Sequence, residues 1–166
     1  METHGINLFI VDDNNLMVKS LELYLKNKFG NLLRISTFGN GRSALEKVDD
    51  KTNIVILDYY MEGQNGLEVL KSIKAKNPKT EVIMLSSNED MALAVQTFRA
   101  GASDYVVKGH GSWKRITNLV TYIITEPIRI ISREFGVSIF VATFLLTFVT
   151  MGIVVTAILY LMGWMK

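Results

Sequence analysis

Short apolar runs that alternate with helical patterns most constrain the fold of the first 125 residues. The five runs, rich in Val, Ile, Leu and Phe, lie at 8–11, 32–38, 54–57, 81–85 and 104–107. The segments with helical spacing of apolar residues lie at 16–29, 41–48, 66–75, 88–99 and 113–124. A short, continuous apolar run is typical of a parallel strand that is buried on both faces. The alternation therefore predicts an α/β fold of five strand-helix units around a five-stranded parallel sheet.

Polar residues follow four of these predicted strands. Asp12 and Asp13 come after the first run, Asp58 ends the third, Ser86 follows the fourth and Lys108 follows the fifth. Parallel strands share one carboxyl edge, where open sheets bind ligands. Three carboxylates repel one another unless a cation lies between them, and all-oxygen ligation favours Mg²⁺. With an ammonium and a hydroxyl nearby, the set predicts a phosphoryl-binding site in which the central Asp58 is the nucleophile.

The C-terminal part of the chain has a different composition. No charged residue occurs between Glu134 and Lys166. A helix of that length exceeds the roughly 30 Å of a bilayer core. We expect a single transmembrane helix over 136–165, with a buried helix of a water-soluble protein as the alternative. We also expect Pro127 to end the fifth helix, so that 126–135 forms a juxtamembrane segment after a domain at 1–125.

The basic residues indicate an orientation for this expected span. Those on its N-terminal side are Lys114, Arg115, Arg129 and Arg133. The positive-inside rule then places the first domain in the cytoplasm and the C-terminus outside the membrane. The lipid bilayer is thus an expected partner. Small residues spaced four apart in this segment would also allow a homodimer of helices.

Composition argues against several other classes of protein. The chain has no cysteine, which excludes disulfides, thiolate metal sites and cysteine nucleophiles. Its two histidines argue against a zinc centre with several histidine ligands. A formal charge of +2 is too small to indicate nucleic acid as a partner, since proteins that bind nucleic acid usually have a clustered basic face, and no such partner is expected.

Four ordered motifs resemble a known family. They are FIVDD at 9–13, IVILD at 54–58 with Met61 and GLEVL at 66–70, VIMLS at 82–86, and GASDYVVK at 101–108. Any one of these motifs alone is weak evidence for a family. The ordered set is specific evidence, because each motif lies at the end of a successive predicted strand. Residues 6–125 resemble the CheY-like receiver domain of two-component response regulators. The resemblance implies a flavodoxin-like (βα)5 fold.

The resemblance also implies roles for the acidic residues. Asp58 is expected to accept a phosphoryl group from a histidine kinase or a phosphotransfer protein. Asp12, Asp13, Asp58 and the backbone carbonyl of Tyr60 are expected to hold Mg²⁺. The chain would assist only its own phosphorylation and dephosphorylation, and is therefore not expected to be an enzyme.

Three further positions match the family's phosphoryl contacts and its switch. Ser86 and Lys108 are expected to contact the phosphoryl oxygens. Ser86 and Tyr105 are expected to rearrange on phosphorylation, which would change the surface that an output protein recognises. The sequence does not identify that output protein.

Two departures from the family pattern keep alternatives open. Gly109 follows Lys108, and Glu62 follows Met61, where receivers commonly have proline. A phosphorylation-independent membrane adaptor with a degenerate receiver is therefore an alternative. A phosphohydrolase with an aspartate nucleophile is a weaker one, since the haloacid dehalogenase family carries a second aspartate where this chain has Tyr60.

Overall fold

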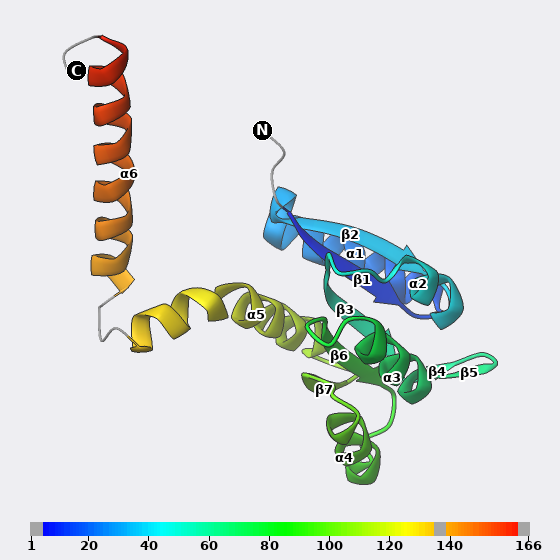
Figure 1. The fold of residues 1–166 in the computed structure, drawn as a ribbon. Coiled ribbons are helices and arrows are strands. Elements are labelled where there is room, and N and C mark those ends of the chain that lie inside the picture. Colours follow the sequence, from blue (N-terminus) through cyan, green and yellow to red (C-terminus); the bar gives the residue numbers. More distant parts are fainter. Residues whose placement is uncertain (1–4, 135–138, 163–166) are drawn as a thin grey trace. The chain divides into compact units, whose positions relative to one another are not determined.

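The computed structural model describes residues 5–134 and 139–162. The chain divides into two compact units, Met1–Thr121 and Tyr122–Lys166. The first contains a five-stranded parallel sheet in the order β2-β1-β3-β6-β7 (Figure 1). Its strands are β1 (Ile6–Val11), β2 (Leu33–Phe38), β3 (Thr52–Asp58), β6 (Glu81–Ser86) and β7 (Asp104–Val107). The predicted α/β class with five parallel strands is thereby confirmed.

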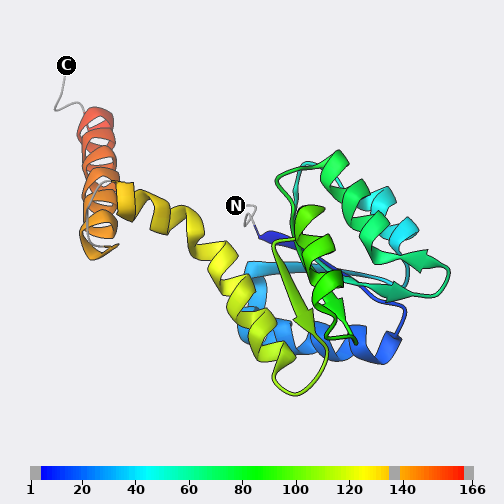
Figure 2. The same cartoon turned by 90° about the horizontal axis from the view of Figure 1, so that it is seen from below.

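Helices connect the strands and cover both faces of the sheet. They are α1 (Asn15–Phe29), the short 3-10 turn η1 (Gly30–Leu32), α2 (Gly41–Lys47), α3 (Gly66–Lys76), α4 (Met91–Arg99) and α5 (Ser112–Glu134). Figure 2 shows α1 and the start of α5 on one side of the sheet, with α2, α3 and α4 on the other. The rings of Tyr24 in α1 and Trp113 in α5 lie 5.4 Å apart, which joins these two helices directly.

Alternating strand residues supply the two halves of the core. In β1, Phe9 and Val11 pack in a cluster with residues of α2 and α3. Successive side chains of a strand point to opposite faces, so Leu8 and Ile10, both almost fully buried, belong to the face of α1 and α5. A strand that is buried on both sides in this way needs an apolar residue at nearly every position.

Local signals set the helix starts. Asn14, Asn40, Asn65 and Asp90 are N-caps whose side chains accept hydrogen bonds from backbone N–H groups in the first turn. The fourth helix was predicted from residue 88 but begins at Met91, because Asp90 caps it. A small hairpin that was not predicted, β4 (Tyr60–Met61) and β5 (Gln64–Asn65), follows β3.

The predicted end of the fifth helix is wrong. The helix continues through Pro127 to Glu134, ten residues beyond the predicted end at residue 124. Proline removes one backbone donor from a helix, but it can be accommodated without ending the helix. The second unit also contains α6 (Ile139–Leu161).

The membrane localisation requires a correction. In the part of the chain that the structure describes, no helix meets the length and hydropathy required to cross a membrane. The expectation rested on the absence of charge throughout 136–165, and this range includes 136–138 and 163–165, which lie outside the described residues. The predicted single-pass localisation, with a cytoplasmic domain and an external C-terminus, is therefore contradicted. The domain boundaries 1–125, 126–135 and 136–165 stay a prediction.

Candidate functional site

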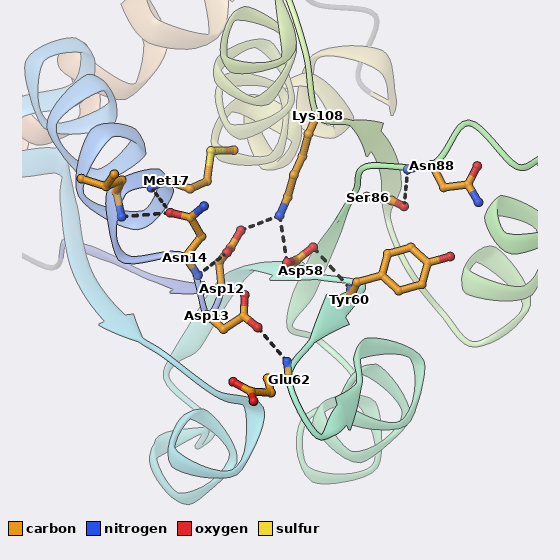
Figure 3. Close-up of polar contacts among 11 residues, drawn as sticks. Asp12, Asp13, Asn14, Met17, Asp58, Tyr60, Glu62, Ser86, Asn88 and Lys108 are labelled. Carbon is orange, nitrogen blue, oxygen red and sulfur yellow. Dashed lines mark hydrogen bonds and ion pairs between the residues drawn. The ribbon is translucent and has the colours of Figure 1, made fainter.

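The carboxyl ends of four strands bring the predicted site residues to one edge of the sheet. The parallel registers pair Val11 with Leu57, Asp58 with Leu85, and Ser86 with Val107. These pairs place the ends of β1, β3, β6 and β7 level with one another. Side chains from these ends converge in Figure 3.

A lysine bridges two buried carboxylates at the centre of this edge. Lys108 Nζ lies 2.8 Å from Asp12 Oδ2 and 2.8 Å from Asp58 Oδ2. Asp12 is 1% exposed and Asp58 is 3% exposed. Removal of these charges from water is costly unless they are paired, and the lysine provides that pairing. The structure therefore joins β1, β3 and the end of β7 through one ammonium group.

The same contacts shift the ionisation of both partners. Burial raises the pKa of Asp58, the hydrogen bond from Lys108 opposes this rise, and the nearby charge of Asp12 adds to it. Burial alone would lower the pKa of Lys108, but the hydrogen bonds and charges of Asp12 and Asp58 outweigh it and raise that pKa. Lys108 is thus a permanent cation at neutral pH.

Three acidic residues at this edge fit a divalent cation. Asp12, Asp13 and Asp58 each offer a carboxylate oxygen, and these oxygens lie within 4.8 Å of one another. When all three are ionised, Lys108 compensates one of the three charges, which leaves a formal excess of two negative charges for a cation. Hard oxygen ligands of this kind suit Mg²⁺.

Backbone N–H groups orient these carboxylates. The Asn14 N–H donates to Asp12 Oδ1 at 2.9 Å, and the Tyr60 N–H donates to Asp58 Oδ1 at 3.4 Å. The Glu62 N–H donates to Asp13 Oδ2 at 2.7 Å (Figure 3). The predicted ligation by the Tyr60 carbonyl stays a prediction.

The residues predicted as a switch meet at Asn88, which sequence reasoning missed. The Asn88 N–H donates to Ser86 Oγ at 3.0 Å, while the Tyr105 hydroxyl donates to the Asn88 carbonyl at 2.7 Å. Tyr105 is 6% exposed, so its ring lies inside the protein. The main chain of one residue thereby connects the two predicted switch side chains. Since only backbone atoms take part, no residue type in the sequence indicates this connection.

Comparison with known proteins supports the resemblance to receiver domains that the sequence motifs indicate. Residues 8–120 match the model of the response regulator receiver domain. The regulator NtrC of Escherichia coli K12 is 37% identical over 102 residues, which cover 61% of this chain and 21% of NtrC. The chemotaxis protein CheY of Listeria monocytogenes is 34% identical over 110 residues, which cover 62% of this chain and 86% of CheY. The chain spans 24% of the length of ZraR from Klebsiella oxytoca.

Solved structures agree in fold. The BeF3-activated receiver domain of DrrB, a Thermotoga maritima protein, aligns with a TM-score of 0.64 and 28% identity, covering 72% of this chain and 97% of that domain. A CheY-like receiver domain protein from Methanospirillum hungatei aligns with a TM-score of 0.66 at 18% identity, covering 74% of this chain and 97% of that one. The second likeness supports the fold alone.

Proposed function

This chain belongs to the family of response regulator receiver domains, and from that premise we propose that Asp58 accepts a phosphoryl group from a histidine kinase or a phosphotransfer protein. The single observation that carries the proposal is the position of Lys108 between the buried carboxylates of Asp12 and Asp58. A cation held at the carboxyl edge of a parallel sheet suits a transferring phosphoryl group.

The transfer would proceed by attack of an Asp58 carboxylate oxygen on phosphorus. A new O–P bond forms, the bond between phosphorus and the donor breaks, and the donor leaves with the electron pair of that bond. Lys108 would release its hydrogen bond to Asp58 and neutralise a phosphoryl oxygen. Mg²⁺, held by Asp12, Asp13 and Asp58, would supply positive charge to the other oxygens. The product is an acyl phosphate, and the chain acts as a stoichiometric acceptor rather than as an enzyme with a separate substrate.

A phosphoryl group on Asp58 would also change the contacts of Ser86. The Ser86 hydroxyl would donate a hydrogen bond to a phosphoryl oxygen. To reach that oxygen, it would have to leave its present position, where it accepts a hydrogen bond from the Asn88 N–H. Movement of Asn88 would in turn shift the acceptor of the Tyr105 hydroxyl. The conformational signal therefore passes from the site to the start of α4 through one stretch of main chain.

The test is incubation of the full chain with Mg²⁺ and acetyl phosphate, followed by detection of an acid-labile phosphoprotein. Asp58→Ala should abolish the label. Asp50→Ala is the matched control, because Asp50 is an exposed aspartate in the turn before β3. Full labelling of Asp58→Ala, or no label on the wild-type chain, would contradict the proposal. The second of these outcomes would favour the phosphorylation-independent adaptor.

A further inference from the structure

Residue 62 contacts the acidic site through its backbone. The Glu62 N–H donates a 2.7 Å hydrogen bond to Asp13 Oδ2, across 49 positions in sequence. We propose that this N–H is a positioning group, which holds Asp13 in its ligand orientation and thereby sets the affinity of the site for Mg²⁺. The inference rests on the proposed function, because it requires that Asp13 binds the metal.

Of the three expected ligands, Asp13 depends most on this hydrogen bond, which we call the tether. Asp12 and Asp58 are buried and each forms an ion pair with Lys108, whereas Asp13 is exposed at the rim of the site. An exposed carboxylate samples several rotamers, and metal binding must select one of them. A hydrogen bond that already selects this rotamer removes part of that cost from binding.

The turn that carries Glu62 is itself held in place. Glu62 and Gly63 join β4 to β5, in which Tyr60 pairs with Asn65 and Met61 pairs with Gln64. The Gln64 side chain also accepts hydrogen bonds from the N–H groups of Gly41, at 2.7 Å, and Arg42, at 3.2 Å, where α2 begins. The hairpin is thus fixed to α2 on one side and to Asp13 on the other. Asp13 is tethered to a fixed part of the fold.

The residue type at position 62 decides whether the tether exists. Proline, which receivers commonly carry here, has no N–H and could not donate to Asp13. Proline is nevertheless compatible with this turn, since Gly63 has φ +68°, as expected at the third position of a type II turn, and proline is favoured at the second. Glu62→Pro should therefore remove the donor and keep the hairpin.

The experiment compares Glu62→Pro with Glu62→Ala in the full chain. Both variants lose the glutamate side chain, but only the alanine variant keeps the N–H. Mg²⁺ affinity is measured by calorimetric titration, and as the Mg²⁺ concentration that gives half-maximal labelling with acetyl phosphate. We expect Glu62→Pro to bind Mg²⁺ about five- to tenfold more weakly than Glu62→Ala, because binding must then also order a side chain that the hydrogen bond would otherwise have ordered already. Labelling of the two variants should reach the same maximum at saturating Mg²⁺.

Equal Mg²⁺ affinities of two folded variants would overturn the inference and leave the proposed function intact. Absence of both Mg²⁺ binding and labelling in the wild-type chain would overturn both. If Glu62→Pro does not fold, hydrogen exchange of the Glu62 amide decides the question. Slow exchange in the wild-type chain that becomes at least about tenfold faster in Asp13→Ala supports the hydrogen bond to Asp13. Fast exchange in the wild-type chain, or slow exchange that is unchanged in Asp13→Ala, refutes it.

Discussion

Replacement of Lys108 by methionine tests the electrostatics of the site most directly. Methionine fills much of the space of the lysine stem but has no charge. The substitution would leave Asp12 and Asp58, at 1% and 3% exposure, without the ammonium that now lies 2.8 Å from each. We expect Lys108→Met to destabilise the first unit in the absence of metal.

The size of the effect follows from the burial of the three groups. Removal of one partner from a buried ion pair costs about 3–5 kcal/mol. The Lys108 side chain is 23% exposed, so the lower value, about 3 kcal/mol, applies at neutral pH. The unfolding entropy is about 2.1 cal/mol/K per residue, or about 250 cal/mol/K for residues 1–121. A loss of about 3 kcal/mol then lowers Tm by about 12 °C.

Urea unfolding in the presence of a chelator measures this loss. The control is the same substitution in an Asp58→Asn background, where one of the two carboxylates is already neutral and the cost should be smaller. Added Mg²⁺ should return part of the lost stability to Lys108→Met, because the metal binds the folded chain. The reasoning fails if Lys108→Met stays within 0.5 kcal/mol (roughly the spread of ordinary surface substitutions) of the wild-type chain, or if its cost is the same in the Asp58→Asn background.

Three further predictions concern neighbouring parts of the site. Gly66→Ala should lower the free energy of unfolding in urea by about 3 kcal/mol, because the added Cβ would lie 2.3 Å from the Asp58 carbonyl oxygen. The control is Gly39→Ala, whose Cβ meets nothing within 4 Å. Equal losses of stability in the two variants would contradict the argument. Asp58→Asn should be more stable than the wild-type chain at neutral pH without metal. Burial raises the pKa of Asp58, so protonation of Asp58 stabilises the folded wild-type chain. The stability advantage of Asp58→Asn should therefore shrink, and should not grow, as pH falls through that pKa. Tyr105→Phe should cost about 1 kcal/mol and speed amide exchange at the start of α4, because the Asn88 carbonyl loses its donor; unchanged exchange there would argue against the link.

Most of the fold could be predicted because its strands carry a strong local signal. Residues 54–57 are apolar at every position, and the structure places them within β3, buried on both faces. The β4–β5 hairpin gave no such signal, because two-residue strands are too short to show periodicity. Pro127 gave a local signal that was wrong. Proline commonly ends a helix and therefore predicts a helix boundary here, but α5 continues through it.

In the candidate site, the side chains could be predicted from the sequence but the backbone contacts could not. Asp12, Asp58 and Lys108 could be predicted together, since each follows or ends a strand and parallel strands end at a common edge. The N–H groups of Glu62 and Asn88 could not, because any residue except proline supplies the same donor. Their positions depend on the turn and loop geometry, which residue types specify weakly.

The bridge between Asp12 and Lys108 joins residues that lie 96 positions apart. During synthesis Asp12, Asp13 and Asp58 leave the ribosome before Lys108, so a nascent chain has its acids without their cation. An incomplete chain therefore has the buried carboxylates of Asp12 and Asp58 without the ammonium that pairs with them, even where its first strands have already paired. The ion pairs of the site can form only after the last strand of the sheet, β7, and the lysine that follows it have been synthesised.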